Sequence, residues 1–416
     1  MILPPSHTGF LLVSTIIGLL GITAIRKPKN GILYSVILLI LMGLVIIYSR
    51  SRACAIAGII GLFYVVCTFY TRLNSGKILL SSLPIFYLLS FILYFVRIPS
   101  AQGRILIWHV CLKMVVHNPI GYGPNGMEKQ YLLNQASYFE TNPISPFSIY
   151  ADNVAIPYNE FIRIAVLFGL LGLFAFIFIL VNVLITTRDY GKNDLLKVLL
   201  ISYLAFASFS YPFSFLSTAI LFLALIYYLK KQWCGKLINT LCLITLVSYS
   251  LSTAVKTYIE NQIITISLSN NSESTFKGRI VQNQQLFDLF PHIADILMQC
   301  SNDNDDQYEN IIENAALFSP NTDSYCKMGD ILIKRGQIDD GLSYYNKAIH
   351  MVPTKINPMY RLFLAYLNIN EYQMAEYVGM SICSMPIKIQ SRESILILED
   401  VRNKLDSLHL RASCER

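Results

Sequence analysis

Several arginines stand at the ends of apolar segments in the first half of the chain, where a cation is costly unless it is paired or used. Arg52 opens an apolar run, Arg104 lies in a long polar loop, and Arg163 falls just inside another run. A guanidinium is a planar fork of donors that suits phosphate, so these cations fit a pyrophosphate-linked lipid at a membrane surface. The alternative is that they only reach lipid headgroups. The whole set predicted on this surface is Arg50, Arg52, Arg97, Arg104, Lys113 and Arg163.

Long apolar segments must position these residues. Of the 416 residues, 54% are hydrophobic and only 14% are charged, whereas a soluble domain is about 25% charged. A helix that crosses a bilayer needs roughly 17–25 apolar residues. We therefore predict an all-α fold whose first part is a polytopic membrane domain. Tyr211-Pro212-Phe213 alone separates the sixth and seventh segments, which would also fit a tight re-entrant hairpin. The eight predicted spans are 8–25, 31–48, 53–71, 78–96, 160–186, 195–211, 213–229 and 235–254.

The distribution of basic residues predicts which side of the membrane each loop faces. One set of alternate short loops holds eleven basic residues, whereas the short loops on the other side hold only Arg50 and Arg52. The richer side is cytoplasmic by the positive-inside rule. The N-terminus, the 97–159 loop and the C-terminal tail then face the exterior, which is the periplasm for a bacterial inner membrane. We attribute the net charge of +7 to this topology and not to nucleic-acid binding.

The last third of the chain has the charge density of a soluble protein, so we place the domain boundary between 1–255 and 256–416. Prolines recur there every 33 residues, with a small residue five positions before each. This pattern is similar to the tetratricopeptide repeat, in which paired helices pack closely and stack into a solenoid. We predict two clear repeats, a weaker one at about 284–320 and a capping helix at 387–408. The prolines are Pro320, Pro353 and Pro386, and the small residues are Ala315, Ala348 and Ser381.

The 97–159 loop begins with a stretch of helical periodicity at 103–117 that contains Trp108. Tryptophan favours the membrane–water interface, so we expect this helix to lie there. Asn118-Pro119 is expected to end the helix, and Gly121-Tyr122-Gly123-Pro124 is expected to form a tight turn.

Short motifs follow one another in a fixed order through the membrane half. They are Ser51-Arg52-Ala53, Gly103-Arg104 with Trp108, Asn118-Pro119-Ile120-Gly121-Tyr122-Gly123, Ala151-Asp152-Asn153, Tyr158-Asn159-Glu160-Phe161 and Phe168-Gly169-Leu170-Leu171-Gly172-Leu173. In their order and spacing they resemble the O-antigen ligase and polymerase family of bacterial envelope glycosyltransferases. The resemblance covers roughly residues 1–230, and it is closest to Bacteroidetes-type members that carry a C-terminal tetratricopeptide tail.

The resemblance implies transfer of a glycan from an undecaprenyl-pyrophosphate carrier at the periplasmic face, without a metal or other cofactor. The acceptor is a lipid A-core sugar or a protein hydroxyl in a ligase and another lipid-linked glycan in a polymerase, and the sequence leaves this choice open. The resemblance also implies that Arg52, Arg104 and Arg163, with Arg50 beside them, bind the pyrophosphate and stabilise its developing charge.

Two positions depart from the family pattern. Many ligases have a histidine base where this chain has Tyr158, and tyrosine, with a pKa of about 10, is a poor base at neutral pH. Leu167 stands where a glutamate usually precedes the Gly-x-x-Gly of the following span. We therefore assign the catalytic role to Glu160 or Asp152, two carboxylates beside the predicted membrane surface, with Tyr158 and Asn159 next to them.

Other functions stay open. A degenerate, non-catalytic scaffold would use the repeat tail to bind an envelope partner, and a structural pedestal would need no ligand. A transporter ranks last, because the spans hold almost no ionisable residues. Pro4 to Phe10 also resembles a mid-chain segment of longer relatives, so we expect the sequence to be N-terminally truncated or mis-started.

No metal site is predicted. His109 and His117 lie eight residues apart without a third ligand at suitable spacing, and the other histidines, His7 among them, are assigned to the surface by default. The acidic run at Asp303–Asp306 lacks the glycine and glutamate of a calcium loop, so a solvated loop is expected there.

Overall fold

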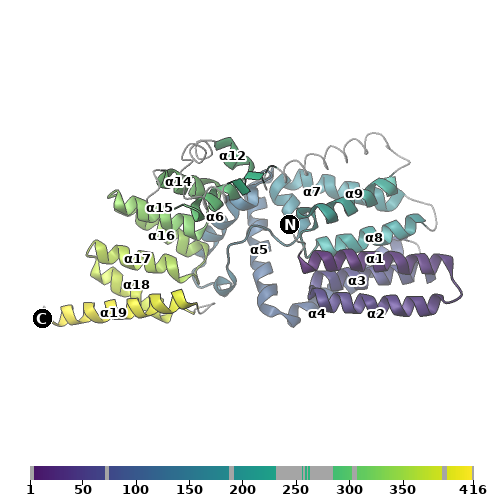
Figure 1. Cartoon of the computed structure of the whole chain (residues 1–416), viewed down its shortest axis with the longest axis horizontal. Helices are drawn as coiled ribbons and strands as arrows, with labels where there is room; N and C mark the ends of the chain where they lie inside the picture. Colours follow the sequence, from purple (N-terminus) through teal and green to yellow (C-terminus); the bar gives the residue numbers. More distant parts are fainter. Residues whose placement is uncertain are drawn as a thin grey trace. The chain divides into compact units, whose positions relative to one another are not determined.

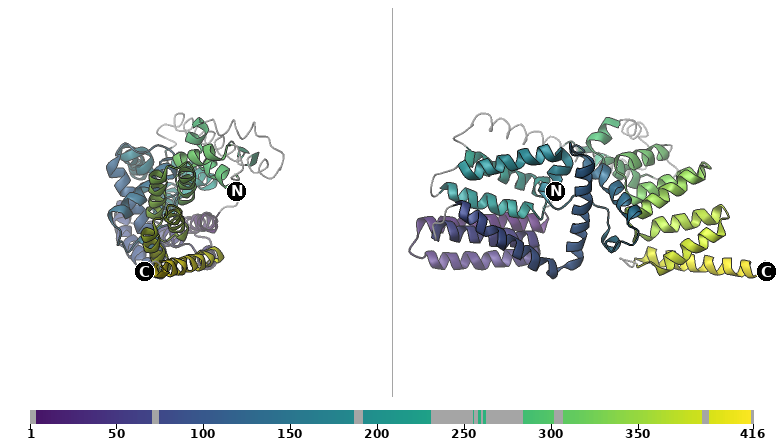
Figure 2. Two further views of the ribbon diagram at one scale, coloured as in Figure 1. Left: turned by 90° about the vertical axis from the view of Figure 1, so that its left-hand side faces the viewer. Right: turned by 180° about the vertical axis from the view of Figure 1, so that it is seen from behind.

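The computed structural model describes residues 4–70, 75–186, 192–230, 255, 258–259, 261–262, 284–301, 307–386 and 391–414. These residues form helices joined by short connections, with no strand among them, which confirms the predicted all-α class. The chain divides into two compact units, the first made of 1–101 and 156–255 and the second of 102–155 and 256–416. Figures 1 and 2 show the helices of each unit from three sides.

The first unit is a bundle of apolar helices. In both views of its long side, α1, α2, α3 and α8 run side by side (Figures 1 and 2). Gly61 of α3 allows a close approach, because a Cβ there would lie 2.5 Å from the side chain of Ile17 and 3.2 Å from that of Ser202. The elements of this unit are α1 (Pro5–Arg26), α2 (Gly31–Ser49), α3 (Arg52–Val65), η1 (Val66–Tyr70), α4 (Ser75–Val96), α7 (Glu160–Thr186), α8 (Lys192–Ala207), η3 (Pro212–Ser214) and α9 (Leu216–Lys230).

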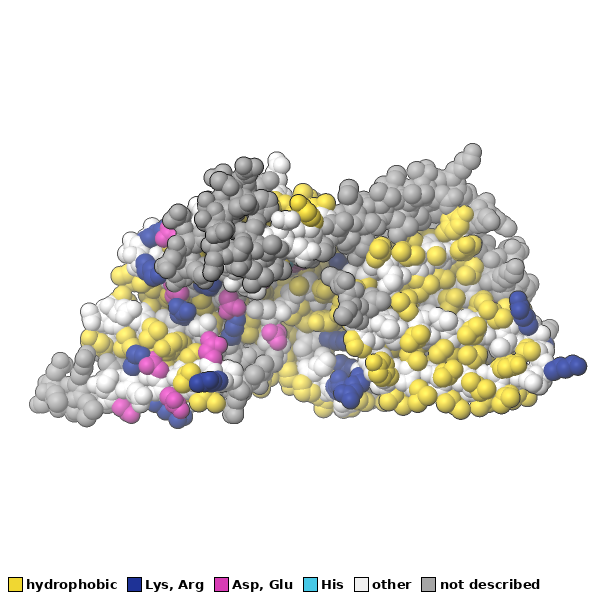
Figure 3. Space-filling model, in the orientation of Figure 1, with side chains coloured by type: hydrophobic (Ala, Val, Ile, Leu, Met, Phe, Trp, Pro, Cys, Tyr) yellow, Lys and Arg dark blue, Asp and Glu magenta, His cyan; other side chains and the backbone are white. Residues whose placement is uncertain are grey.

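Four helical segments of the described chain are long and apolar enough to cross a membrane, or five if α4 and the helix after it form one bent span. Figure 3 shows hydrophobic side chains covering the visible face of α1 and α2, with lysine and arginine side chains at its two ends. The chain therefore has the helices of an integral membrane protein. The four segments are Pro5–Arg26, Gly31–Ser49, Arg52–Tyr70 and Glu160–Leu184.

The predicted sixth and seventh spans form helices shorter than expected. The helices α8 and α9 have 16 and 15 residues and pack on each other across the connection 208–215. The helices stop early because Pro212 opens a separate 3-10 turn between them. The predicted eighth span, 235–254, lies outside the described residues.

In the second unit, each helix of the tail contacts the next one along the chain, and α15, α17 and α19 also form contacts in series. The predicted helix ends are confirmed: α14, α16 and α18 end at Phe318, Met351 and Ser384, each two residues before a recurring proline. The elements of this unit are α5 (Ile98–His117, which starts in the first unit), α6 (Gly126–Thr141), η2 (Ser148–Tyr150), α12 (Gln284–Leu289), α13 (His292–Gln299), α14 (Tyr308–Phe318), α15 (Thr322–Lys334), α16 (Ile338–Met351), α17 (Ile356–Asn368), α18 (Tyr372–Ser384) and α19 (Arg392–Cys414).

Small residues sit where the tail helices pack most closely. Ala315 and Ala348 are fully buried, as their spacing predicts, whereas Ser381 is only half-buried. In the last pair the close approach falls instead at Gly379, where a Cβ would lie 2.9 Å from Leu405. In the middle pair, Gly329 of α15 leaves the space that the Tyr345 ring fills.

The 102–155 segment belongs to the unit of the tail and not to that of the spans, which differs from the division made on sequence. Its helix α6 packs on α16 and α14. Lys129 of α6 forms a 2.6 Å ion pair with Asp288 of α12, and Asn125 donates to the Asp288 carbonyl at 2.6 Å. Composition alone does not reveal this packing, because the sequence separation is more than 150 residues.

The predicted helix in this loop is present as α5 and ends at His117, before Asn118-Pro119. Gly121 and Gly123 have φ angles of 98° and 81°, which confirms the predicted turn. The apolar side chains near the end of α5 differ in exposure. Leu112 and Val116 are exposed, but Val115 is buried within the second unit.

Candidate functional site

The candidate site in the first unit is built around the start of α7. Asn159 caps this helix, its Oδ1 accepting from the backbone N–H of Phe161 at 2.9 Å and of Ile162 at 3.1 Å. Its amide donates to the Ser208 carbonyl at 3.0 Å, which ties the start of α7 to the end of α8. Just before the cap, Tyr158 has a φ of 54°, a conformation that a bulky side chain rarely adopts.

Glu160 is the first residue of α7 and is only 1% exposed. Its Oε1 accepts from the backbone N–H of Phe213 at 2.8 Å and lies 3.5 Å from the Arg163 guanidinium. A carboxylate held in this way positions the 208–215 connection and the arginine. Its geometry therefore favours a positioning role over the role of an accessible general base.

Arg163 lies one helical turn further along α7, on the same face as Glu160. Its guanidinium donates to the Ser214 hydroxyl at 2.7 Å, and the side chain is 27% exposed. The partial exposure leaves room for a ligand at this cation. Ser214 belongs to η3, so three elements, α7, α8 and η3, meet at this point.

His7 is a member of this cluster that the sequence did not indicate. It was expected at the surface, but it is fully buried among Phe206, Tyr211 and Phe215, with ring centroids 5.4, 4.9 and 4.3 Å away. Tyr211 in turn packs against the ring of Tyr158 at 5.4 Å. The Tyr211 ring thus lies between His7 and Tyr158.

Arg52 stands at the same end of the bundle. Ser51 caps α3 by accepting from the N–H of Cys54 at 3.3 Å, which makes Arg52 the first residue of the helix. The Cys54 thiol donates to the Ser6 carbonyl at 2.8 Å, next to His7. Arg52 donates to the Ser100 hydroxyl at 2.8 Å and to the Arg97 carbonyl at 3.5 Å. Arg50 is exposed at the end of α2, with a φ of 47°.

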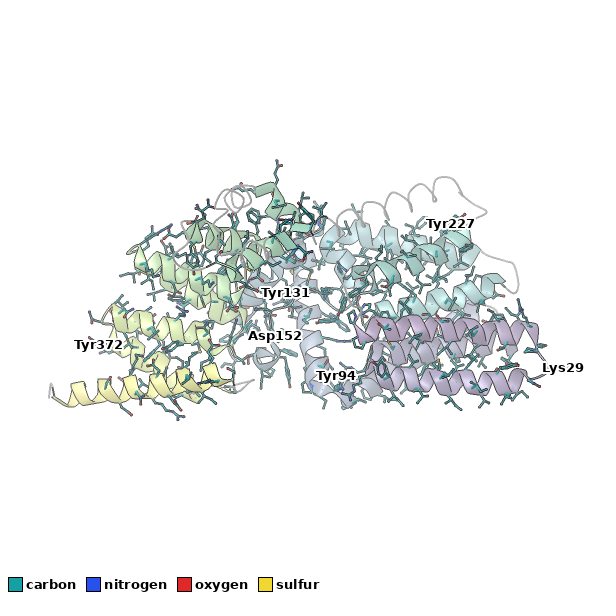
Figure 4. All side chains as sticks on the ribbon, in the orientation of Figure 1. Lys29, Tyr94, Tyr131, Asp152, Tyr227 and Tyr372 are labelled. Carbon is teal, nitrogen blue, oxygen red and sulfur yellow. The ribbon has the colours of Figure 1, made fainter. Side chains whose placement is uncertain are left out.

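The remaining predicted site residues, Asp152 and Arg104, belong to the second unit. Arg104 is half-buried on α5. Asp152 is exposed and lies in the extended segment after η2, and its Oδ1 accepts from the N–H of Asn153 at 2.9 Å. Figure 4 labels Asp152, together with Tyr131 of α6.

Gln135 of α6 anchors the Asp152 segment. It is fully buried and donates to the carbonyl of Asp152 at 3.2 Å and to that of Met351, at the end of α16, at 2.6 Å. The Tyr131 hydroxyl donates to the Gln135 Oε1 at 2.7 Å. Burial, and secondarily Cys111, raise the pKa of Tyr131 well above its usual value, so this hydroxyl stays protonated and remains a donor.

Within the described part of the chain, no group of three or more His, Cys, Asp or Glu side chains is placed to hold a metal ion. The His109 ring packs against Tyr138 at 5.3 Å, and the Nδ1 of His117 lies 2.8 Å from the Lys113 carbonyl. The acidic run at Asp303–Asp306 lies outside the described residues.

No protein-family model matches the chain, and neither a curated protein nor a solved structure matches it significantly. The functional argument therefore rests on the residues and their geometry.

Proposed function

We propose that the chain is a membrane glycosyltransferase that moves a surface glycan from an undecaprenyl-pyrophosphate carrier to an acceptor, as a ligase or a polymerase of the O-antigen type. The observation that carries the proposal is that Arg52 and Arg163 share one end of an apolar bundle. A hydroxyl and a carbonyl orient Arg52, and a hydroxyl orients Arg163 beside the buried Glu160. Fixed cations at a membrane surface suit a pyrophosphate leaving group.

In the proposed reaction, an acceptor hydroxyl attacks the anomeric carbon of the carrier-linked glycan. The bond from that carbon to the pyrophosphate oxygen breaks, and undecaprenyl pyrophosphate leaves. Arg52 and Arg163, with Arg50, stabilise the charge that develops on it. The proton of the acceptor hydroxyl passes to a carboxylate, the role that the sequence assigns to Glu160 or Asp152. Asn159, Glu160 and Tyr158 position the start of α7.

The proposed topology has eight crossings of a bacterial inner membrane, with the N-terminus, the 97–159 loop and a tetratricopeptide-type tail in the periplasm. Two observations support it. The 102–155 segment and the tail form one compact unit, so both lie on one side of any membrane. The start of α1, the start of α3 and the connection between α8 and α9 also meet at one end of the bundle.

Complementation of a strain that lacks the gene tests the proposal. We expect Arg52→Ala and Arg163→Ala to abolish the glycan ladder on a gel and to leave the lipid-linked donor accumulated in the membrane. Arg26→Ala, at the opposite end of α1, is the matched control and should restore the ladder. Equal ladders in all three strains, at equal protein levels, would overturn the proposal.

A non-catalytic scaffold is the second candidate, and the burial of Glu160 favours it. A scaffold would need the tail but none of the arginines. In that case both arginine variants would complement fully, and the full chain would still retain an envelope partner through residues 284–414 in a pull-down.

A further inference from the structure

The second unit holds a pocket of about 390 Å³ whose walls come from two distant parts of the sequence. One wall is the segment Ala151-Asp152-Asn153, which follows η2. The opposite wall comes from the first turns of α15, α17 and α19. This volume lies within the range of about 300–1,000 Å³ that is typical of small-ligand sites.

The tail contributes to the pocket in a repeating way. Asp323, Asn357 and Glu393 are each the second residue of their helix, and each lines the pocket. The helices α15, α17 and α19 thus each present one polar side chain from the same structural position. The Lys355 ammonium group is held between the Asp323 carboxylate and the Thr322 hydroxyl, at 2.7 Å from each.

Buried groups hold the two walls together. Gln135, fully buried, donates both to the Asp152 carbonyl and to the carbonyl of Met351, which immediately precedes Val352 in the pocket wall. On the α19 side, Ser391 and Ser394 cap the helix reciprocally, with N···O distances of 2.9 and 3.1 Å. The polar side chains are therefore presented on fixed backbone, which a binding site requires.

The side chains that line the pocket indicate which class of ligand it binds. Three carboxylates, those of Asp152, Asp323 and Glu393, stand against the single ammonium of Lys355 in the lining, so its side chains carry a net negative charge that disfavours phosphate. Carboxylates accept hydrogen bonds, and the amides of Asn153 and Asn357 both donate and accept. A ligand with many hydroxyls satisfies all of these groups, while Val352 and Ile356 offer apolar contact to C–H faces.

We infer that this pocket binds the sugar units of the acceptor glycan, in a segment that carries no phosphate. That the bound glycan is the acceptor rests on the proposed function. That the pocket binds sugar units rests on its lining alone. The loop segment with Asp152 then lies against the bound glycan, and the repeats set which glycan is accepted.

Saturation-transfer NMR on the detergent-solubilised full chain tests the inference. The probe is the oligosaccharide released by mild acid from the envelope glycan of the same cells. We expect binding to the wild-type chain and at least a fivefold weaker affinity in Asn357→Ala and in Glu393→Gln. The matched controls are Asn368→Ala and Glu399→Gln, exposed positions further along the same two helices, and they should bind like the wild type.

Every outcome decides the question. No saturation transfer to the wild-type chain, or equal affinity in the pocket and control variants, overturns the inference. Pentalysine that binds the wild type but not Glu393→Gln, while the oligosaccharide gives no saturation transfer, would show a site for cationic peptides instead. Binding that depends on the pocket, together with arginine variants that keep a normal glycan ladder, would retain the sugar site and reject the transferase.

Discussion

At the scale of single residues, the start of α7 combines three unusual features within a few positions: the left-handed Tyr158, the buried Glu160 and the half-buried Arg163. A buried carboxylate is tolerated when donors satisfy it, and here a backbone N–H and a guanidinium do so. Strained backbone and buried charge are expensive, and they gather where a site must be held in one geometry.

The roles of base and positioning residue can be separated at Glu160. Glu160→Gln keeps an oxygen that accepts from the Phe213 N–H, whereas Glu160→Ala leaves that buried donor unpaired, at a cost of about 1–3 kcal/mol. We expect Glu160→Gln to retain a substantial part of the transferase activity and Glu160→Ala to lose both activity and several degrees of melting temperature. Gel assays of the glycan ladder and thermal unfolding in detergent measure the two effects. If Glu160 were the base, Gln and Ala would be equally inactive.

Gly169 has a backbone conformation that excludes other residues. Its φ of 70° and ψ of −172° interrupt α7 in the middle of a span, in a region available essentially to glycine alone. We expect Gly169→Ala to destabilise the chain by about 1–3 kcal/mol, seen as a lower melting temperature in detergent. Gly43→Ala in α2 is the control, because nothing lies within 4 Å of a Cβ there. Equal melting temperatures would show that α7 straightens without cost.

At the scale of elements, the helices of the tail are joined by side chains that reach across more than one partner. The Tyr345 hydroxyl of α16 donates to Asp330 of α15 at 2.5 Å, and Arg361 of α17 donates to the same carboxylate at 2.7 Å. Burial and then the hydrogen bond to Asp330 raise the pKa of Tyr345, so the hydroxyl remains a donor at any physiological pH.

The close packing of α15 and α16 can be tested at Gly329. A Cβ there would lie 2.5 Å from Cε1 of the Tyr345 ring, which is buried and held by Asp330. We expect Gly329→Ala to cost about 1–3 kcal/mol, because an overpacked core shifts its backbone or its rings. Circular dichroism during thermal unfolding measures the loss. Ser343→Ala, exposed on α16, serves as control and should unfold like the wild type.

The sequence predicted these elements better than their contacts. The recurring prolines located the ends of α14, α16 and α18, because a proline acts on the helix next to it. The spacing of the prolines did not predict that Asp323, Asn357 and Glu393 occupy equivalent positions. The reason is that the connection between α18 and α19 is longer than the connection between α16 and α17. His7 gave no signal at all, because its partners Phe206, Tyr211 and Phe215 are about 200 residues away.

The contact between α6 and the tail links elements that are far apart in the sequence, and Gln135 is its buried polar group. Gln135→Leu removes the donor to two carbonyls and the acceptor of Tyr131, each buried polar loss costing about 1–3 kcal/mol. We expect faster hydrogen exchange in 126–153 and earlier proteolytic cleavage there. Gln373→Leu, exposed on α18, is the control. Unchanged exchange in Gln135→Leu would mean that apolar packing alone holds α6.

At the scale of the whole molecule, the two units constrain the path of the chain through a membrane. The chain leaves the second unit after residue 155, passes through 156–255 of the first unit and returns to the second. Because we expect a compact unit to lie on one side of the bilayer, we expect an even number of crossings between 156 and 255. The sequence predicts four spans there, and the described residues include α7, α8 and α9.

The same constraint puts the 102–155 segment and the tail on one side of the membrane, and single cysteines can show which side it is. One chain keeps only the native, exposed Cys383 of α18, and a second has only the cysteine of Asn142→Cys, at the end of α6, with every other cysteine changed to serine. Both chains should react with an impermeant maleimide added outside the cell. Lys29→Cys, in the basic loop after α1, should react only after the membrane is permeabilised. Because α6 and α18 belong to one unit, Cys383 and Asn142→Cys must give the same result. If the two positions are labelled from opposite sides, the packing of the 102–155 segment on the tail is wrong, and the proposed acceptor pocket falls with it.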